Sequence, residues 1–196
     1  MRDTGRPALA MLSIAIVALC AMHVRTIRAQ GNVLQAQAIL HGAPGSGITG
    51  VVRFTQAPAG SGMPEPTVDV DARIDGLTPG LHGIHIHENG NCDSVTGPFS
   101  GAGGHFDPGP FGNSGPDVNH PFHMGDIPNL DVNPAGVGRL RHTTSRITLS
   151  AGPLSVFDTS GSAVVVHQNI DQGITGAAGS GVSGGARVAC GVIEPL

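Results

Sequence analysis

The 196-residue chain contains no tryptophan, no tyrosine and no lysine, so all ten of its formal positive charges are arginines. Aromatic residues make up 3% of the chain and charged residues 12%, and the formal net charge is -4. Nucleic-acid binding usually requires a basic surface together with aromatic side chains on which bases can stack. The sequence offers no basic run and few aromatic rings, so we expect no nucleic-acid partner.

Helix-forming sequence is also scarce. The chain contains 31 glycines and 15 prolines, nearly a quarter of its residues, and both types interrupt helices. This composition excludes coiled coils and long helical bundles. A domain of the remaining ~166 residues, once an N-terminal segment is set aside, can bury roughly 70% of its surface without help from disulfides or metals. A disulfide or metal site in this chain therefore calls for a functional explanation.

The N-terminal segment resembles an export signal. Two arginines precede an apolar run of 15 residues, Ala8–Met22, which is shorter than the roughly 20 residues of a membrane span. We predict that residues 1–30 form a signal peptide or an N-terminal anchor and that residues 31–196 form one domain. An uncleaved membrane tether and acylation at Cys20 are the alternatives. In each case the domain is exported, and is periplasmic, extracellular or anchored facing outward.

Two cysteines remain in the predicted domain, Cys92 and Cys190. Disulfides persist outside the cytoplasm, so a bridge between them is favoured over two free thiols. It would tie the middle of the domain to its last strand.

The rest of the chain has the pattern of short strands. Val68–Asp75 alternates apolar and polar residues without a fault, which is typical of a half-buried strand. Clusters of glycine, proline and asparagine separate it from similar segments, and this predicts an all-β sandwich or barrel. The other predicted strands are Val33–His41, Ile48–Gln56, Leu81–Glu88, Ser145–Leu149, Ala163–His167 and Arg187–Ile193.

Two connections, Asn89–Arg139 and Gln168–Ala186, are too long for simple hairpins. Long loops in a compact domain are commonly functional, and the first of these contains histidines and a cysteine. We therefore expect two functional loops, and we expect bonds made by its histidines and cysteine to hold the first of them in place.

Ten histidines in so sparsely charged a chain indicate metal chemistry. His85 and His87 lie two positions apart on a predicted strand, so both imidazoles project from one face and can reach one ion. Imidazole suits copper and zinc, and a set of six imidazoles with one carboxylate is suited to two ions that share a ligand. The further candidates are His105, His120, His123, Asp126, His167 and Asp171.

Several ordered motifs resemble the copper/zinc superoxide dismutase family, and the resemblance extends from about Val33 to Ile193. It implies a Greek-key β-barrel of the immunoglobulin-like sandwich class, in agreement with the strand pattern. The motifs are His85-Ile86-His87-Glu88, Gly104-His105-Phe106-Asp107-Pro108, His123-Met124-Gly125-Asp126, Val165-Val166-His167 and Gly185-Ala186-Arg187-Val188-Ala189-Cys190-Gly191.

The resemblance also implies roles for single residues. The copper ligands would be His85, His87, His105 and His167, with His105 shared as a bridge to zinc. His123 and Asp126 would bind zinc, and Cys92 and Cys190 would form the family's disulfide. Arg187 would draw the anion to copper, and Asp171 would link a copper histidine to a zinc histidine, fixing both rings.

The remaining zinc histidine is where the sequence departs from the family pattern. The family places it about eight residues after the bridging histidine, in a position that is Asn113 in this chain. His120, three residues before His123, is the nearest candidate. The alternative is a zinc-poor site that binds copper alone.

The implied function is the conversion of superoxide to dioxygen and hydrogen peroxide by a Cu(II)/Cu(I) cycle, which protects against superoxide outside the cytoplasm. Arg187 would pair with the anion and His105 would carry a proton. The rival interpretations are a copper-holding module without catalysis and a barrel that has lost its metals. Residues 168–186 contain Asp171 and no basic residue, which argues against strong electrostatic steering. The sequence leaves the oligomeric state open, with a homodimer among the options.

Overall fold

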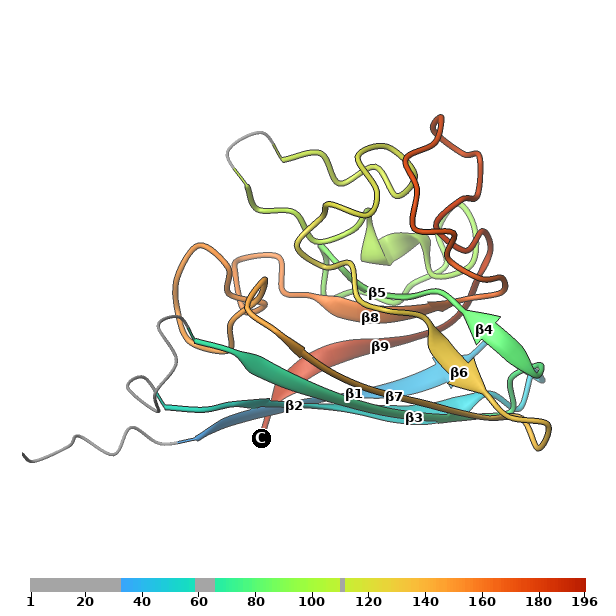
Figure 1. The fold of residues 1–196 in the computed structure, drawn as a ribbon, viewed down its shortest axis with the longest axis horizontal. Coiled ribbons are helices and arrows are strands. Elements are labelled where there is room, and N and C mark those ends of the chain that lie inside the picture. The colour runs from blue at the N-terminus through green and yellow to red at the C-terminus, as the bar shows by residue number, and fades with distance from the viewer. Residues whose placement is uncertain (1–32, 59–65, 110–111) are drawn as a thin grey trace, which may run out of the picture.

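The computed structural model describes residues 33–58, 66–109 and 112–196. Figure 1 shows the strands and one short 3-10 helix, η1 (Ser100–Ala102). The strands are β1 (Leu34–Gly42), β2 (Thr49–Gln56), β3 (Val68–Asp75), β4 (Gly80–His82), β5 (Ile84–His87), β6 (Leu130–Val132), β7 (Val137–Thr144), β8 (Ala163–His167) and β9 (Arg187–Pro195).

The nine strands form one antiparallel sheet in the order β4-β6-β7-β3-β2-β1-β9-β8-β5. The two ends of this order, β4 and β5, are consecutive in the chain and separated only by Gly83, so the sheet curls into a nearly closed barrel (Figure 1). The long loops that follow β5 and β8 lie together on one side of the barrel. The predicted all-β barrel is confirmed.

The core follows the alternation of the sequence. In β3, Val68, Val70, Ala72 and Ile74 are buried and the aspartates and arginine between them point outward. The same rule places the inward residues of β1, β2 and β8 in one apolar cluster, which extends to Phe106 beneath the loops. Burial of each large aliphatic side chain contributes about 1.5–3 kcal/mol, so the barrel forms a firm base for its loops.

Two of the predicted strands need correction, and β6 and β7 were not predicted, although β6 and the start of β7 lie within the connection Asn89–Arg139. The predicted strand Leu81–Glu88 is divided at Gly83, whose N–H donates to the Asn169 carbonyl and whose carbonyl accepts from the His167 N–H, both at 2.8 Å. The chain changes partners there, from β6 on one side to β8 on the other.

The prediction of a strand at Ser145–Leu149 is wrong. This segment is buried at Ile147 and Leu149 but bends away from the sheet, and its Leu149 N–H donates to the Gln56 side chain at 2.6 Å. The strand that does occur, β7, lies directly before it. Its inward positions include Gly138, so the apolar signal that marks the other strands is weak there.

Within the described residues, no helix is long and apolar enough to cross a membrane. The predicted signal peptide or anchor, residues 1–30, lies outside them.

Candidate metal centre

The barrel brings together four histidines that are far apart in the sequence. His85 and His87 lie on β5, which pairs with β8 in the register His85↔Val165, so His167 at the end of β8 lies near them. His105 reaches the same place through a bridge with His87. All four side chains are buried, His167 being 2% exposed and the others 0%.

These four rings offer one nitrogen each within 4.8 Å of one another. The rings of His85 and His105 have centroids 4.2 Å apart, and those of His87 and His167 are stacked at 5.7 Å. In each of these four rings one buried nitrogen has no hydrogen-bond partner among the residues that the structure describes, namely His85 Nδ1, His87 Nε2, His105 Nε2 and His167 Nε2. Buried polar atoms are rarely left without partners, so this donor set fits a metal with affinity for imidazole.

In three of these rings the opposite nitrogen is fixed by the protein. His87 Nδ1 donates to the Gly103 carbonyl at 3.1 Å and His167 Nδ1 to the Gly185 carbonyl at 2.9 Å. His85 Nε2 donates to Asp171 Oδ2 at 3.0 Å. Such bonds set the tautomer and leave the free nitrogen of each ring directed at the common centre.

A second group of ligand atoms surrounds Asp126. His105 Nδ1 lies 2.6 Å from its Oδ1, while His123 Nδ1 and His120 Nδ1 lie 2.9 and 3.2 Å from its Oδ2. His85, His105, His120 and Asp126 form a mutually close set, which His123 joins through Asp126. This group of nitrogen and oxygen donors has the chemistry that zinc prefers.

Gly125 explains how Asp126 approaches the barrel so closely. The Gly125 carbonyl accepts from the Ile86 N–H at 2.9 Å, and a Cβ at Gly125 would lie only 2.2 Å from the Ile86 carbonyl oxygen. A side chain at position 125 would push the loop away from β5, and with it His123 and Asp126.

Asp171 connects the two groups. Its Oδ2 accepts from His85 Nε2 and its Oδ1 from His120 Nε2 at 2.7 Å. Asn129 holds the backbone of Asp171 through two bonds of 2.9 Å, one with each side-chain amide atom. Asn129 was not predicted from the sequence, because an asparagine before a short strand carries no signal of its own.

The pKa values of the four histidines of the first group are shifted in the opposite direction from those of His120 and His123. Burial, together with neighbouring histidines, lowers the pKa of His85 and His105 to about 4 and of His167 to about 3, and lowers that of His87 as well. These rings are neutral at pH 7, so their free lone pairs are available to a metal.

His120 and His123, which belong to the second group alone, behave in the opposite way. Burial opposes a charge on His120, but hydrogen bonds with Asp126 and Asp171 outweigh it and raise the His120 pKa to about 9. The His123 pKa is raised for the same reason by Asp126. Burial would raise the pKa values of Asp126 and Asp171, but bonds from the histidines hold both well below the usual range.

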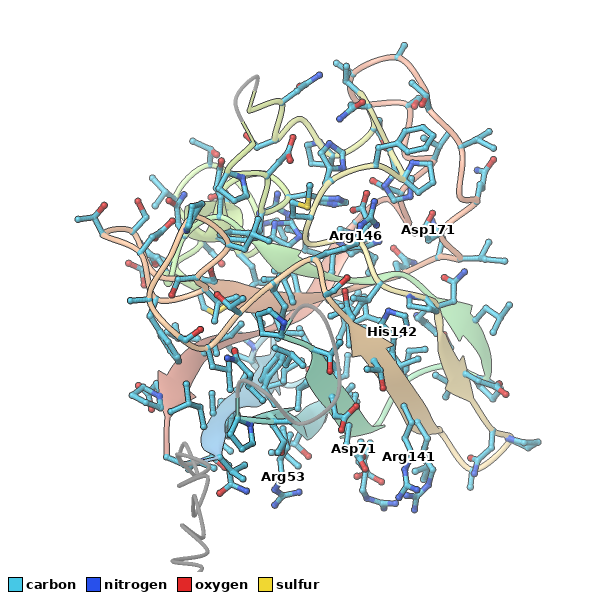
Figure 2. All side chains as sticks on the ribbon, turned by 60° about the vertical axis from the view of Figure 1, so that its left-hand side comes forward. Arg53, Asp71, Arg141, His142, Arg146 and Asp171 are labelled. Atoms are coloured by element: carbon cyan, nitrogen blue, oxygen red, sulfur yellow. A yellow bond between two sulfur atoms is a disulfide. The ribbon has the colours of Figure 1, made fainter. Side chains whose placement is uncertain are left out.

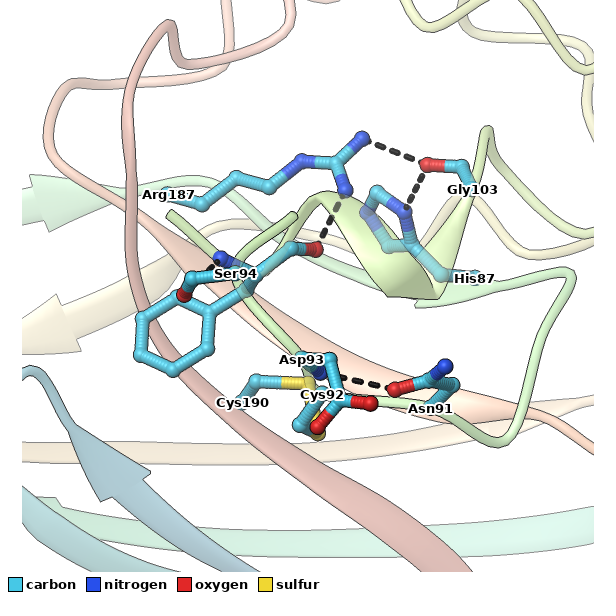
Figure 3. The surroundings of a disulfide bond; sticks show 9 residues. His87, Asn91, Cys92, Asp93, Ser94, Gly103, Arg187 and Cys190 are labelled. Carbon is cyan, nitrogen blue, oxygen red and sulfur yellow. Dashed lines mark hydrogen bonds between the residues drawn. A yellow bond between two sulfur atoms is a disulfide. The ribbon is translucent and has the colours of Figure 1, made fainter. Parts of the chain in front are cut away.

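Arg187, the first residue of β9, lies beside the first group. Its guanidinium donates to the Phe99 carbonyl at 2.8 Å and to the Gly103 carbonyl, which also accepts from His87 (Figure 3). The loop that supplies these carbonyls is joined to β9 by the disulfide Cys92–Cys190, as the sequence predicts. Burial lowers the Arg187 pKa, and Glu88 partly offsets this.

Two cavities border the site from different sides. One, of about 400 Å³, is lined by His167, Arg187 and Asp117 among others and opens toward the first group. The other, of about 620 Å³, borders Asp126 and Asp171 and is lined also by Arg146 and His142 (Figure 2). The structure thus gathers all seven predicted ligand residues, with Asp171 between the two groups and Arg187 beside the first.

Comparisons with known proteins agree with this geometry. The family model described as copper/zinc superoxide dismutase matches residues 48–193. A superoxide dismutase [Cu-Zn] of Deinococcus radiodurans is 38% identical over 157 residues, which cover 76% of this chain and 79% of that protein.

Two further relatives cover more of the chain. An extracellular superoxide dismutase [Cu-Zn] of Drosophila melanogaster is 35% identical over 186 residues, which cover 92% of this chain and 96% of that protein. The crystal structure of the clock protein EA4 matches with a TM-score of 0.60 and 34% identity, over 83% of this chain and 94% of that one. With the family model matched over most of its length, the chain belongs to the copper/zinc superoxide dismutase family, whose members are oxidoreductases that act on superoxide and use copper and zinc.

Proposed function

We propose that this protein dismutates superoxide by a Cu(II)/Cu(I) cycle at the four-histidine group, and that it does so outside the cytoplasm. The observation that carries the proposal is the convergence of four buried, neutral imidazoles, each with a free nitrogen. Copper held there by His85, His87, His105 and His167 supplies one-electron exchange, which zinc, being redox-silent, does not.

His105 occupies a special place in this proposal because both of its ring nitrogens face ligand groups. Its Nε2 is directed at the first group and its Nδ1 at Asp126. Nε2 could hold a proton in the reduced state of the site and pass it to the reduced oxygen. Two superoxide ions and two protons then give one dioxygen and one hydrogen peroxide.

Arg187 supplies a positive charge in the lining of the cavity of about 400 Å³ that also includes His167. With Arg187→Gln we expect kcat/KM for superoxide and the affinity of azide for the copper site each to fall by about tenfold. This factor corresponds to the lower end of the free energy that a charge-assisted hydrogen bond contributes. Arg187→Lys should recover part of both, because the charge returns. Copper content and stopped-flow dismutation are the measurements.

Arg53→Gln is the matched control, because Arg53 is an exposed arginine on β2 that lies outside both metal groups. Equal loss in both variants, or no loss in Arg187→Gln at full copper content, would remove Arg187 from the mechanism.

The second group is proposed to hold zinc through His105, His120, His123 and Asp126. A structural zinc almost always has four ligands, and His120 completes the set although it does not occupy the usual family position. His120→Ala should lower zinc content well below that of the wild type while copper is retained. Activity should fall less than in variants of the copper ligands. Elemental analysis of protein loaded with both metals measures this.

His142→Ala controls for loss of a partly buried histidine outside both groups. Zinc content that is unchanged in His120→Ala would exclude His120 as a ligand. A wild-type protein that takes up copper alone would favour the zinc-poor alternative.

Export is supported by two observations. The protein contains a disulfide, and its Drosophila relative is named an extracellular enzyme. The predicted signal or anchor in residues 1–30 agrees with this location, and cleavage would release a domain that faces superoxide generated outside the cytoplasm.

A further inference from the structure

Asp117 is a buried carboxylate in the loop that follows β5, and it belongs to neither metal group. Its side chain is 5% exposed and accepts three hydrogen bonds from the loop that follows β8. Oδ2 accepts from the Gly181 N–H at 2.9 Å, and Oδ1 accepts from the N–H and hydroxyl of Ser183 at 3.1 and 2.9 Å. The Asp117 carbonyl accepts a further bond from the Gly176 N–H at 2.8 Å.

These bonds join the two long loops at the edge of the copper-side cavity. Asp117, Gly181 and Ser183 line the same cavity of about 400 Å³ as His167 and Arg187. The backbone of Ser183 also forms an isolated β-bridge with that of Asp171. The bonds between Asp117 and Ser183 are therefore linked to the carboxylate that joins the two metal groups.

Other bonds hold this loop near Asp171 and Gly185, but the hydrogen bonds that the structure describes between its residues 176–183 and the loop after β5 all go to Asp117. Gly179, Gly181, Gly184 and Gly185 all have positive φ values, and a Cβ at Gly179 would meet no atom within 4 Å. A segment with few buried side chains and exposed backbone opens easily, so three bonds to one carboxylate are a large share of what orders it.

Asp117 does not act as a partner of a cation. Within residues 33–58, 66–109 and 112–196, no salt bridge involves it. Burial would raise its pKa, but the bonds from Gly181 and Ser183 hold the pKa below the usual value, so the carboxylate is ionised when it accepts them.

We propose that Asp117 is a positioning residue for the anion route to copper: it fixes the loop carrying Gly181 and Ser183 as the wall of the cavity in front of His167 and Arg187. The catalytic part of this inference rests on the proposed function. A fixed wall keeps the passage suited to a small anion. Without Asp117 the loop moves outward, superoxide is guided less well, and larger anions reach the copper site.

The first test measures the loop without reference to catalysis. In metal-loaded protein, hydrogen exchange of the amides of residues 176–183 should accelerate at least about tenfold in Asp117→Ala, the effect of losing bonds to a charged acceptor. Asp117→Asn should accelerate exchange less, because its Oδ1 can still accept from Ser183. Asp158→Ala, which removes an exposed carboxylate bonded to Ser160 in another loop, should leave these amides unchanged.

The second test measures the passage. Copper extraction by the bulky anionic chelator diethyldithiocarbamate should be about tenfold faster in Asp117→Ala than in the wild type. The factor is the same as for amide exchange, because both processes depend on opening of the same loop. The kcat/KM for superoxide should fall while the electron paramagnetic resonance spectrum of Cu(II) stays the same, because no ligand has changed. A changed spectrum would show that Asp117 shapes the copper site itself and would overturn the proposal.

The outcomes separate the two hypotheses. Unchanged exchange at residues 176–183 overturns the role of Asp117 whatever the enzyme does. Faster exchange without faster copper extraction would mean that the loop is not the wall of the passage. A wild-type protein that exchanges as expected but does not dismutate superoxide would refute the proposed function and leave the loop contact standing.

Discussion

His167→Ala is expected to lower superoxide dismutation by at least about a hundredfold, because it removes one of the four imidazoles that would bind copper. Loss of a group that only hydrogen-bonds to a metal ligand already costs about 10–100-fold in metal affinity or activity. His167 is almost fully buried at the end of β8, and its Nδ1 is fixed by the Gly185 carbonyl. The barrel does not depend on this ring, since its core is the apolar cluster beneath. Activity per bound copper and the Cu(II) spectrum are the measurements.

His87→Ala tests the same site from β5 and should give a loss of similar size. His41→Ala is the control, because His41 is an exposed histidine on β1, outside both metal groups. Circular dichroism and thiol titration should show a folded protein with an intact disulfide in all three variants. Dismutation like that of the wild type in His167→Ala or His87→Ala, with copper loaded, would refute the copper assignment.

The sequence predicted the regular part of the fold well. β3 and β8 have the predicted bounds because each of their apolar residues is buried, and the polar residues of β3 lie on its outer face. β7 was missed because its outward positions carry Arg139 and Arg141 while one of its inward positions is a glycine. Alternation identifies a strand only where the buried face is apolar, and here the neighbouring strands supply that apolar surface.

The site was predictable to the extent that its residues lie in short motifs. His85 and His87 share a strand, and His123 and Asp126 share one turn, so local spacing is informative. Asn129 and Asp117 act through contacts 42 and 64 to 66 positions away along the chain, between segments whose approach only the fold determines. No local pattern marks such residues.

His120 is an intermediate case. Its nearness to His123 made it a candidate, but spacing alone gives no direction for its ring. In the structure its Nε2 bonds Asp171 and its Nδ1 lies near Asp126. His120 thus lies against both carboxylates, a placement that its position in the sequence does not reveal.

Removal of the disulfide by the double variant Cys92→Ala/Cys190→Ala should cost about 4–5 kcal/mol of stability in the chain-entropy model for a loop of about 100 residues. The cysteines are 98 positions apart, and Cys190 is 3% exposed in a cluster with Phe99, Ala102, Ala163 and Val165. Alanine suits this apolar cluster better than serine, whose hydroxyl would be buried there. Urea unfolding of the metal-free protein measures the change without a contribution from metal binding.

The bridge also positions Arg187, so the double variant should lose activity even under conditions where it is folded. Arg187 donates to carbonyls of Phe99 and Gly103, and Cys92 holds the segment that carries them against β9 (Figure 3). Thr96→Ala is the control within this loop, because Thr96 is exposed and its side chain takes no part in the bonds of Phe99 and Gly103 to Arg187. A double variant that unfolds at the wild-type urea concentration would exclude a stabilising role for the bridge. Full activity in the folded variant would show that Arg187 is held without it.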